Sequence, residues 1–419
     1  MQIEVVTIGD ELLLGYTVDT NAAHLARALA EIGVEIVRRT TCGDSAASIA
    51  AAVGEGLDRA GAVITTGGLG PTSDDLTKDS IAALFGRQMT LDDEHLAWMR
   101  ARWAARWPER PMPEANVRQA MIPEGARKLA NKHGSAPGIW LEDERGRWVA
   151  MLPGVPSEMR GMLSDTLLPL VRQRAGQIAR VVRSRTLRTT GVAESLVADQ
   201  VASIPGGVGE VDLAYLPNTD GVDLRLTVRD APPREADERL DAAAARLRTV
   251  LTASIYGEGD ADLAAILLDH CRSAVLTLAV AESCTGGMLG ARLTAIPGSS
   301  DVVRGGVIAY DDSAKIALLG VPAESIRQHG AVSEPVVLAM ASGARRALQA
   351  DVAIAVTGIA GPGGGSAGKP VGTVWIAADV QGHLESRLLR LWGNRSEIRQ
   401  RSAQAAMELL RRRLVAPPR

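Results

Sequence analysis

The stretch VLTLAVAESCTGGMLGARL, residues 275–293, holds an apolar run, a short polar turn and a helical pattern, in that order. Residues 275–281 consist mainly of Val, Leu and Ala and predict a buried strand. Gly286 and Gly287 predict the turn that leads from this strand into the helix. A strand that passes through a turn into a helix is the building unit of α/β domains, so we predict such a domain here.

The same alternation continues on both sides of this stretch, with one interruption in the middle of the chain. We predict two three-layer, doubly wound α/β domains joined by a small α+β module, which makes the chain an α/β protein. The module is predicted from a strand, a helix, a hairpin turned at PNTDG (217–221) and a long helix. The predicted domains are residues 1–170, 171–257 and 258–419.

Composition narrows the classes of function. The chain has 419 residues, a net charge of −3 and only 3% aromatic residues, with a single Phe, so its cores must be built from aliphatic side chains. The slightly negative charge argues against nucleic acid or membranes as partners. Three scattered cysteines suit a reducing compartment, and no apolar run approaches the roughly 20 residues of a membrane span. We therefore expect a cytoplasmic protein.

Ser283 is the candidate nucleophile of the C-terminal domain. It stands where a strand ends, at the edge of the sheet where α/β proteins bind ligands. Backbone N–H groups at the start of the following helix are candidates for stabilising an oxyanion. Thr285, Gly286 and Gly287 complete the turn, and the glycines allow a substrate to approach the backbone closely. These features favour a hydrolase with a serine nucleophile.

A serine nucleophile needs a base, and Lys315 is the best placed candidate. It follows the predicted strand 303–310, near the same sheet edge, and Tyr310 could position it. Such a base must be partly desolvated. The histidines are poorly placed, since His270 precedes the strand, His329 is followed by Gly330 in a loop, and His383 lies in a predicted turn. We therefore expect a Ser-Lys pair instead of a histidine triad.

Other interpretations of these residues remain open. Ser283 could cap the helix, Cys284 could be a nucleophile or a core residue, and Lys315 could be a solvated surface residue. Residues 363–369 fit the GxxxxGK spacing of a P-loop, but Pro370 replaces the hydroxyl residue and a strand follows. We reject a P-loop and keep a Gly-rich loop near a substrate phosphate.

A second candidate site follows the predicted strand 62–66. Its loop, GGLGPTSDD (67–75), predicts a phosphate cradle with a carboxylate for a hydrated, magnesium-type ion. A tight turn with a helix cap from Thr72 and Asp75 is the alternative. Acidic residues follow the first two strands as well. The predicted metal-binding residues are Asp10, Glu11, Asp44 and Asp75, and the predicted substrate-binding residues of the cradle are Gly67, Gly68, Gly70 and Thr72.

Five motifs, in order, resemble the C-terminal domain of the CinA family. They are AESCTGG (281–287), GVIAY (306–310) with Lys315, HGAVSEP (329–335), TGIAGP (357–362) and KPVGT (369–373). The resemblance implies an amidohydrolase that converts nicotinamide mononucleotide to nicotinic acid mononucleotide and ammonia, without a cofactor. It implies Ser283 as nucleophile and Lys315 as base. It further implies supporting or substrate-binding roles for Tyr310, Thr357, Gly358 and Arg395, with Arg399 one helical turn away.

The N-terminal residues resemble the molybdopterin-binding fold and, more specifically, the N-terminal domain of the CinA family. The motifs are TTGGLGPTSDD (65–75), GDEL (9–12), DTN (19–21), GSAPG (134–138) and LPGVPSEM (152–159). The resemblance implies an ADP-ribose pyrophosphatase that depends on a divalent metal ion, Mg²⁺-like or Co²⁺. In the wider fold family, the residues matching Asp44 and Asp75 line the pterin or nucleotide site.

The middle module carries two weaker signals. One is a basic run, and the other is GGVG (206–209), which fits the GxxG loop of KH domains. A solvated face and an ordinary loop are the preferred interpretations. The resemblance implies a structural KH-like module and a homodimer. The basic run consists of Arg172, Arg174, Arg180, Arg183, Arg185 and Arg188.

Three hypotheses for the function of the whole chain follow. They are a bifunctional pyridine-nucleotide hydrolase, which we favour, a molybdopterin-handling enzyme, and a competence or DNA-damage accessory protein that binds single-stranded nucleic acid.

Overall fold

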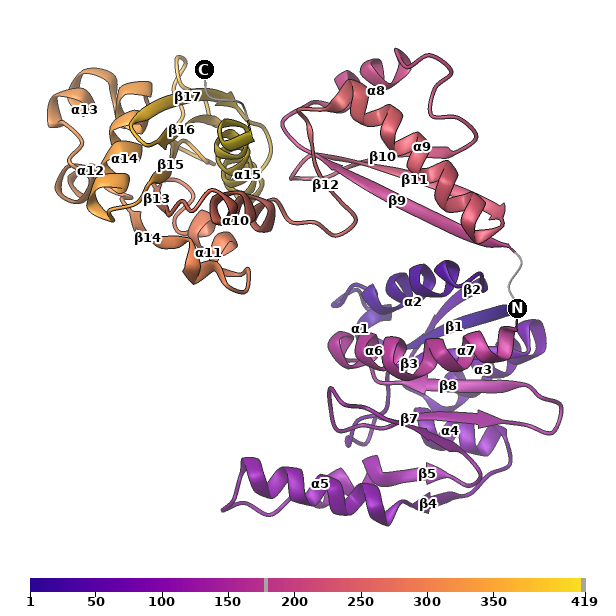
Figure 1. The fold of residues 1–419 in the computed structure, drawn as a ribbon. Coiled ribbons are helices and arrows are strands. Elements are labelled where there is room, and N and C mark those ends of the chain that lie inside the picture. Colours follow the sequence, from indigo (N-terminus) through magenta and orange to yellow (C-terminus); the bar gives the residue numbers. More distant parts are fainter. Residues whose placement is uncertain (177–179, 416–419) are drawn as a thin grey trace. The chain divides into compact units, whose positions relative to one another are not determined.

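The computed structural model describes residues 1–176 and 180–415 of the chain (Figure 1). It divides into two compact units, one of Met1–Arg183 with Arg229–Asp237 and one of Ser184–Val228 with Glu238–Arg419. Among the described residues, no helix is both long and apolar enough to cross a membrane. The α/β class predicted from the sequence is confirmed, and both large sheets are mixed.

The N-terminal sheet has the strand order β2-β1-β3-β8-β7-β6. The first four of these strands run parallel, and β7 and β6 add an antiparallel edge that the sequence did not reveal. Helices cover both faces, as predicted, and each face has its own apolar core. The strands are β1 (Gln2–Ile8), β2 (Glu35–Cys42), β3 (Ala62–Thr66), β6 (Arg127–Leu129), β7 (Gly138–Glu142) and β8 (Trp148–Leu152). The helices are α1 (Asp10–Leu13), α2 (Thr20–Glu31), α3 (Ala46–Ala60), α4 (Thr77–Leu84), α6 (Pro156–Met162), the π-helical turn η2 (Leu163–Leu167) and α7 (Leu168–Ala175).

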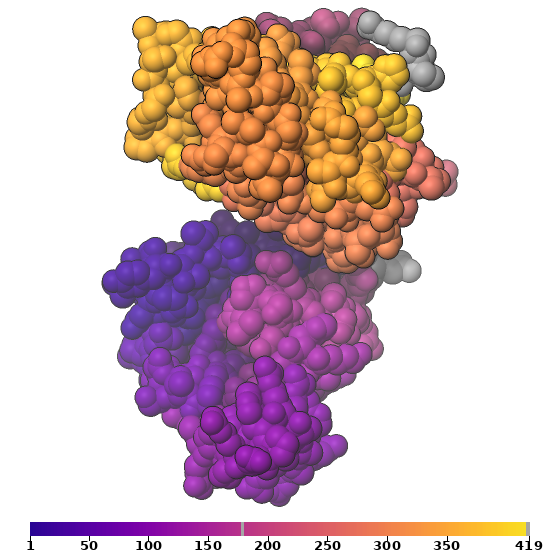
Figure 2. Space-filling model, turned by 90° about the vertical axis from the view of Figure 1, so that its left-hand side faces the viewer, coloured from indigo at the N-terminus to yellow at the C-terminus, as the bar shows by residue number. Residues whose placement is uncertain are grey.

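A small extension projects from this sheet. It consists of α5 (Asp93–Arg106), the 3₁₀ helix η1 (Glu114–Ala120) and the two-stranded ribbon of β4 (Met89–Leu91) and β5 (Met121–Pro123). The ribbon view and the space-filling view both show it standing out from the body of the unit (Figure 1 and Figure 2). Its own core is small, centred on Leu96, Met99 and Ala120.

The middle module is a four-stranded sheet with two helices. The sheet order is β10-β11-β9-β12, and β10 and β11 form the hairpin predicted at residues 217–221. The elements are β9 (Val181–Thr189), α8 (Glu194–Ala202), β10 (Asp212–Pro217), β11 (Val222–Ala231), α9 (Pro233–Leu251) and β12 (Ile255–Glu258). The α+β character predicted for this part of the chain is therefore present.

The C-terminal domain contains a five-stranded sheet of order β14-β13-β15-β16-β17. The first three strands are parallel, and β16 and β17 form an antiparallel edge. The strands are β13 (Leu278–Glu282), β14 (Val303–Ile308), β15 (Val352–Gly358), β16 (Thr373–Val380) and β17 (His383–Arg390). The helices are α10 (Leu263–Ser273), α11 (Met288–Thr294), η3 (Ser299–Asp301), α12 (Asp312–Leu319), α13 (Ala323–His329), α14 (Glu334–Ala347) and α15 (Arg395–Val415).

Two details of this domain differ from the sequence prediction. The strand predicted at 275–281 begins only at Leu278, because Val275 has a left-handed φ of 55° and is 87% exposed. His383 opens β17, so it does not lie in the turn predicted for it.

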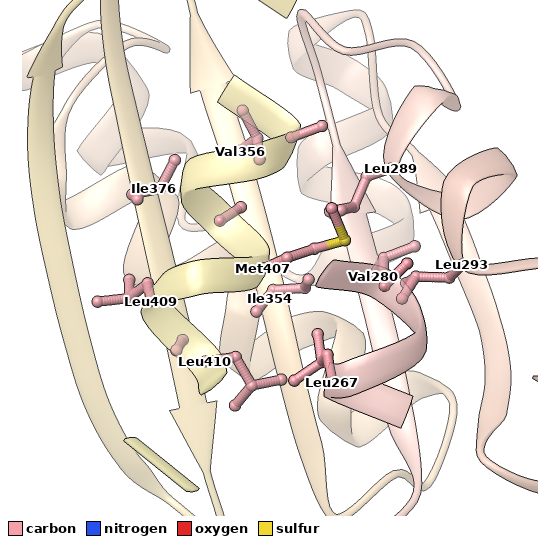
Figure 3. Packing of buried hydrophobic residues seen from close by; sticks show 14 of the residues in the cluster. Leu267, Val280, Leu289, Leu293, Ile354, Val356, Ile376, Met407, Leu409 and Leu410 are labelled. Atoms are coloured by element: carbon pink, nitrogen blue, oxygen red, sulfur yellow. The ribbon is translucent and has the colours of Figure 1, made fainter. Parts of the chain in front are cut away.

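Helix α15 packs against one face of this sheet. Met407 and Leu410 of α15 lie among Ile354 and Val356 of β15 and Leu267 of α10 (Figure 3). The core on the opposite face is rich in alanine. The expectation that aliphatic side chains build the cores is confirmed, and α15 is thereby fixed close to the sheet edge that carries Ser283.

Candidate active sites

Ser283 and Lys315 come to the same edge of the C-terminal sheet. Ser283 follows β13 directly, and Tyr310 stands two residues after the parallel neighbour β14. Lys315 lies one turn into the next helix, α12. Ser283 is 8% exposed and Lys315 only 1%, so the alternative that Lys315 is a solvated surface residue is wrong.

The amino group of Lys315 is held from two sides. Nζ donates to the main-chain oxygen of Tyr310 and to Oδ1 of Asp312, each at 3.3 Å. No hydrogen bond joins Nζ to Ser283 Oγ within the described residues. The lysine is therefore positioned beside the strand ends, and a Ser-Lys proton transfer requires the two groups to approach further when substrate binds.

The start of α11 is occupied by a carboxylate of the protein itself. Glu282 is 1% exposed and accepts hydrogen bonds from the backbone N–H groups of Gly287, Leu289 and Gly290, at 3.0, 3.0 and 2.8 Å. These N–H groups are therefore not free for an oxyanion, which corrects the expectation from the sequence. The helix begins at Met288 without a side-chain cap from its N-cap residue, so the alternative that Ser283 caps it is also wrong.

Two arginines on one face of α15 reach the site. Arg395 donates to the hydroxyl of Tyr310 at 2.7 Å and to the carbonyl oxygen of Gly361 at 2.6 Å. Gly361 belongs to the Gly-rich loop of the C-terminal domain, residues 357–369. Arg399 donates twice to the carbonyl oxygen of Thr285, at 2.6 and 3.2 Å. Arg395 thus ties Tyr310 to the Gly-rich loop, and Arg399 ties α15 to the turn that carries Ser283.

Other predicted residues of this site act on neighbouring backbone. Thr357 is fully buried and donates to the carbonyl oxygen of Ala331 at 2.9 Å, which fixes the loop before α14. Gly358 is needed for packing, because an added Cβ would lie 2.6 Å from Cγ2 of Val374. Gly287 has a φ of 93°, which a residue with a side chain rarely adopts, and it lies against Ile308.

Cys284 does not have the character of a nucleophile. It is 6% exposed, and burial raises the pKa of its thiol to about 12. A thiol with that pKa is not ionised near neutral pH. The alternative that Cys284 belongs to the core is the one that the structure supports, since its side chain is part of the main apolar cluster.

The N-terminal domain has a cavity of about 490 Å³ at the carboxyl ends of its parallel strands. Most of the predicted residues line it, and Asp10 and Thr72 do not. The predicted residues on its wall are Glu11, Asp44, Gly67, Gly68, Gly70 and Asp75. Its position matches the sheet edge at which open α/β proteins bind ligands.

The Gly-rich loop of this cavity is closed by Asp75. Its carboxylate accepts hydrogen bonds from the backbone N–H groups of Gly70 and Thr72, both at 2.8 Å, and from the Thr72 hydroxyl at 2.5 Å. Helix α4 begins only at Thr77, so Thr72 and Asp75 shape the loop and do not cap the helix. Within the described residues, the backbone N–H groups of Gly68 and Leu69 donate no hydrogen bond to the protein. These two donors are therefore available to an anion.

The acidic residues are not gathered into a metal centre. Asp10 and Asp44 each accept a hydrogen bond from the other's backbone N–H, at 3.4 and 2.8 Å. Across residues 1–176 and 180–415, no group of three or more His, Cys, Asp or Glu side chains is close enough to hold a metal ion. Because Asp75 is engaged by its own loop, Glu11 and Asp44 are the predicted carboxylates still available on the cavity wall.

Comparison with known proteins covers nearly the whole chain. The model of the probable molybdopterin binding domain matches residues 4–173, that of the damage-inducible protein CinA KH domain 184–257, and that of the CinA C-terminal domain 260–414. The CinA-like protein of Gemmatimonas aurantiaca is 61% identical over 412 residues, which is 98% of this chain and 96% of that protein. The chain belongs to the CinA family.

Further relatives in the CinA family are more distant. The CinA-like protein of Gloeobacter violaceus is 43% identical and covers 98% of this chain, with 96% of its own length matched. Among solved structures, the competence/damage inducible protein CihA from Agrobacterium tumefaciens is 44% identical. That match covers 35% of this chain and 91% of that chain, with a TM-score of 0.35.

The basic run in and before the KH module is largely neutralised. Among residues 1–176 and 180–415, five of its six arginines form an ion pair with a carboxylate, and the remaining one is Arg172. The pairs are Arg174–Glu142, Arg180–Asp230, Arg183–Asp237, Arg185–Asp241 and Arg188–Asp223. The GGVG loop lies between α8 and β10, and Arg246 donates to the carbonyl oxygens of Gly206 and Gly207. Both observations agree with the preferred interpretation of a solvated face and an ordinary loop.

Sequence reasoning missed several residues of the two sites. Glu282 directly precedes Ser283, but nothing in the sequence shows that its side chain turns back onto the helix. Asn21 was part of the DTN motif without a role. Its Nδ2 donates to Thr66 Oγ1 and to the carbonyl oxygen of Gly154, which joins two walls of the N-terminal cavity. Gln119 lines that cavity too, and no motif pointed to it.

Proposed function

We propose that the C-terminal domain hydrolyses nicotinamide mononucleotide to nicotinic acid mononucleotide and ammonia, with Ser283 as nucleophile and Lys315 as base. The observation that carries this proposal is the placement of a serine without a capping role and a buried lysine at the same ligand-binding edge of the sheet. Hydrogen bonds of Arg395 to Tyr310 and of Arg399 to Thr285 fix the same sheet edge. A fixed edge supports acyl transfer, which needs a precisely placed nucleophile, more than it supports ligand binding alone.

In the proposed reaction, Ser283 Oγ attacks the carboxamide carbon while Lys315 accepts the hydroxyl proton. The tetrahedral intermediate collapses as the lysine returns the proton to the departing nitrogen, which leaves as ammonia. Water then attacks the acyl-enzyme and gives a proton to Lys315. The bond between the acyl carbon and Ser283 Oγ breaks as the lysine returns this proton to Oγ, which releases nicotinic acid mononucleotide and restores both residues. Arg395 and Arg399 bring positive charge to the mouth of the site, which suits a substrate that carries a phosphate.

Product analysis tests this proposal. The full chain is incubated with nicotinamide mononucleotide, and both ammonia and nicotinic acid mononucleotide are measured. Ser283→Ala is expected to abolish both products, and Ser300→Ala, at an exposed position outside the site, should leave them unchanged. Unchanged ammonia release in Ser283→Ala would overturn the choice of nucleophile.

We also propose that the N-terminal domain is an ADP-ribose pyrophosphatase that uses a divalent ion, Mg²⁺-like or Co²⁺. The cavity offers two free backbone N–H groups beside Glu11 and Asp44, which supports a site for a diphosphate and its metal. Mg²⁺ commonly binds through one or two carboxylates together with substrate phosphates and water, so the residues fit an ion that arrives with its substrate. The ion would supply positive charge against the diphosphate.

In this proposed site, the protein's own residues bind and orient the diphosphate and the ion. The N–H groups of Gly68 and Leu69 would bind phosphate oxygens, and Glu11 and Asp44 would hold the ion. Incubation with ADP-ribose and Mg²⁺, followed by assay of AMP and ribose 5-phosphate, tests the activity. Pterin binding without cleavage of ADP-ribose would instead favour a molybdopterin-handling enzyme.

A further inference from the structure

Gln119 lines the N-terminal cavity and is not explained by the packing of the domain. It lies near the end of η1, is 6% exposed and shares the cavity wall with the Gly-rich loop. Its Oε1 accepts a hydrogen bond from the hydroxyl of Ser135 at 3.2 Å. Within the described residues, its Nε2 has no hydrogen-bond partner, and it is not among the fully buried polar atoms that lack one, so it keeps some contact with solvent. Because the residue is buried except toward the cavity, this amide nitrogen is available only to a molecule in the cavity.

The main chain at Gln119 is held by a buried ammonium group. Lys78 of α4 is 3% exposed, and its Nζ donates to the carbonyl oxygens of Arg118, Gln119 and Met121, at 2.5, 3.4 and 3.1 Å. An ammonium group has three hydrogen atoms to donate, so Lys78 uses all of them on this one segment. Since α4 follows the Gly-rich loop directly, Lys78 couples the position of Gln119 to the position of that loop.

The partner that orients the Gln119 amide is itself fixed. Ser135 belongs to a loop organised by Asn131, whose Nδ2 donates to Glu158 Oε2 and to the carbonyl oxygen of Ala136, both within 2.8 Å. His95 holds the same loop through its hydrogen bond with the carbonyl oxygen of Ser135 at 3.0 Å. Ser135 therefore orients the side-chain amide of Gln119, and Lys78 fixes its main chain. This preorganisation lowers the cost of a contact with a ligand.

We propose that Gln119 is a ligand-binding residue of the N-terminal cavity, donating a hydrogen bond from Nε2 to an acceptor atom of a bound nucleoside diphosphate. Lys78 is the positioning residue that holds Gln119 against the Gly-rich loop. The inference rests on the proposed function for the class of ligand, and it deepens it by naming the group that recognises that ligand. Phosphate, sugar and ring-nitrogen atoms all offer the acceptor that this donor requires.

Binding without turnover tests the role of Gln119. The dissociation constant of ADP-ribose is measured by titration calorimetry in EDTA for the full-length wild type, Gln119→Leu, Gln119→Glu and the control Gln88→Glu, which makes the same change at an exposed position. Loss of one neutral hydrogen bond should weaken binding about three- to tenfold in Gln119→Leu. Gln119→Glu should weaken it further, because it replaces a donor by an anion facing an anionic ligand. Binding by Gln119→Glu as tight as that of wild type would overturn the proposal.

A second pair of variants tests the positioning. Lys78→Met should raise KM for ADP-ribose more than it lowers kcat, with a folded protein verified by circular dichroism. If Lys78→Met does not fold, Ser135→Ala provides the same test, since it removes the hydroxyl that orients the amide, and a loss of about two- to fivefold in affinity is expected. Unchanged affinity in Ser135→Ala contradicts the proposed orientation.

Failure of this inference can be distinguished from failure of the proposed activity. A wild type that binds ADP-ribose but does not cleave it with Mg²⁺ rejects the pyrophosphatase, while the ratios of dissociation constants still decide the role of Gln119. A wild type that cleaves ADP-ribose, with all Gln119 variants unchanged, rejects only the inference. A wild type that neither binds ADP-ribose in EDTA nor cleaves it with Mg²⁺ rejects both.

Discussion

The carboxylate of Glu282 accepts a hydrogen bond of 2.8 Å from the backbone N–H of Gly290, eight residues further along the chain. With two further bonds to Gly287 and Leu289, it closes the turn that carries Ser283. A negative charge at a helix N-terminus is favourable, and this one is buried, so the interaction is stronger than an exposed cap. Glu282 is 1% exposed and therefore holds the turn that carries Ser283 from inside the protein.

Glu282→Gln should lower kcat for ammonia release at least tenfold and change KM little. An amide can accept with only one oxygen, and its NH₂ group would face a backbone N–H, so the turn loses part of its support. Kinetics with nicotinamide mononucleotide measure the effect. Glu324→Gln, at an exposed position on α13, is the matched control and should behave as wild type. Equal kcat in Glu282→Gln and wild type would contradict the positioning role.

Cys284 should be dispensable for catalysis and slow to alkylate. Burial raises the pKa of its thiol from 9.0 to about 12, so the native protein at pH 8 should resist iodoacetamide, and Cys284→Ala should release ammonia within about threefold of wild type. In the unfolded chain the thiol ionises above pH 9, but in the folded protein only near 12. The free energy of unfolding should therefore fall as the pH rises through this interval. Loss of activity in Cys284→Ala as complete as in Ser283→Ala is the contrary result.

The two arginines of α15 should have separable effects. Arg399→Gln removes the double hydrogen bond to the carbonyl oxygen of Thr285 and should lower kcat/KM about tenfold through a looser nucleophile turn. Arg395→Gln breaks the link between Tyr310 and the Gly-rich loop and should raise KM more strongly. Arg401→Gln, on the same helix but bonded to Trp392, is the control. Identical kinetics of Arg395→Gln and Arg401→Gln would contradict a role for Arg395 in the C-terminal site.

The elements of both α/β domains were largely predictable, because each follows a local pattern. The strand at Ala62–Thr66 has the predicted bounds, since Gly61 interrupts the apolar periodicity in front of it. The antiparallel edges β6–β7 and β16–β17 were not predicted, because strand direction depends on which neighbour a strand meets. The packing of the whole domain decides which strands become neighbours, and the sequence of a single strand does not show it.

The candidate sites were predictable only in part. Ser283, Lys315 and Tyr310 could be placed at one sheet edge, because the ends of parallel strands meet there. The orientation of carboxylates could not be predicted. Asp75 and Glu282 both turn back onto backbone N–H groups, which removes one expected metal ligand and one expected set of oxyanion donors. Whether a carboxylate faces the protein or a ligand depends on contacts between segments that the sequence does not place.

The full chain should not bind single-stranded nucleic acid in a salt-dependent manner. Binding of this kind requires unpaired cations that release counterions from phosphates, and most arginines of the basic run are already paired with carboxylates such as Asp223 and Asp241. Fluorescence anisotropy with labelled single-stranded RNA and DNA, between about 50 and 200 mM salt, measures it. Affinity that drops steeply over that range, and that is lost in Arg172→Gln, would support the accessory-protein hypothesis instead.

The two proposed activities should respond differently to removal of metal. EDTA should abolish cleavage of ADP-ribose and leave ammonia release unchanged, because Ser283 and Lys315 need no ion for the proposed proton transfer. Asp44→Asn should lower pyrophosphatase activity at least tenfold and raise the concentration of Mg²⁺ needed, since Asp44 and Glu11 are the two carboxylates on the cavity wall that we propose to hold the ion. Asp58→Asn, at an exposed position outside this cavity, is the matched control. Because Asp44 also accepts the backbone N–H of Asp10, excess Mg²⁺ separates the two roles. Recovery at high Mg²⁺ indicates a metal ligand, and a deficit that no concentration restores indicates that Asp44 only shapes the loop.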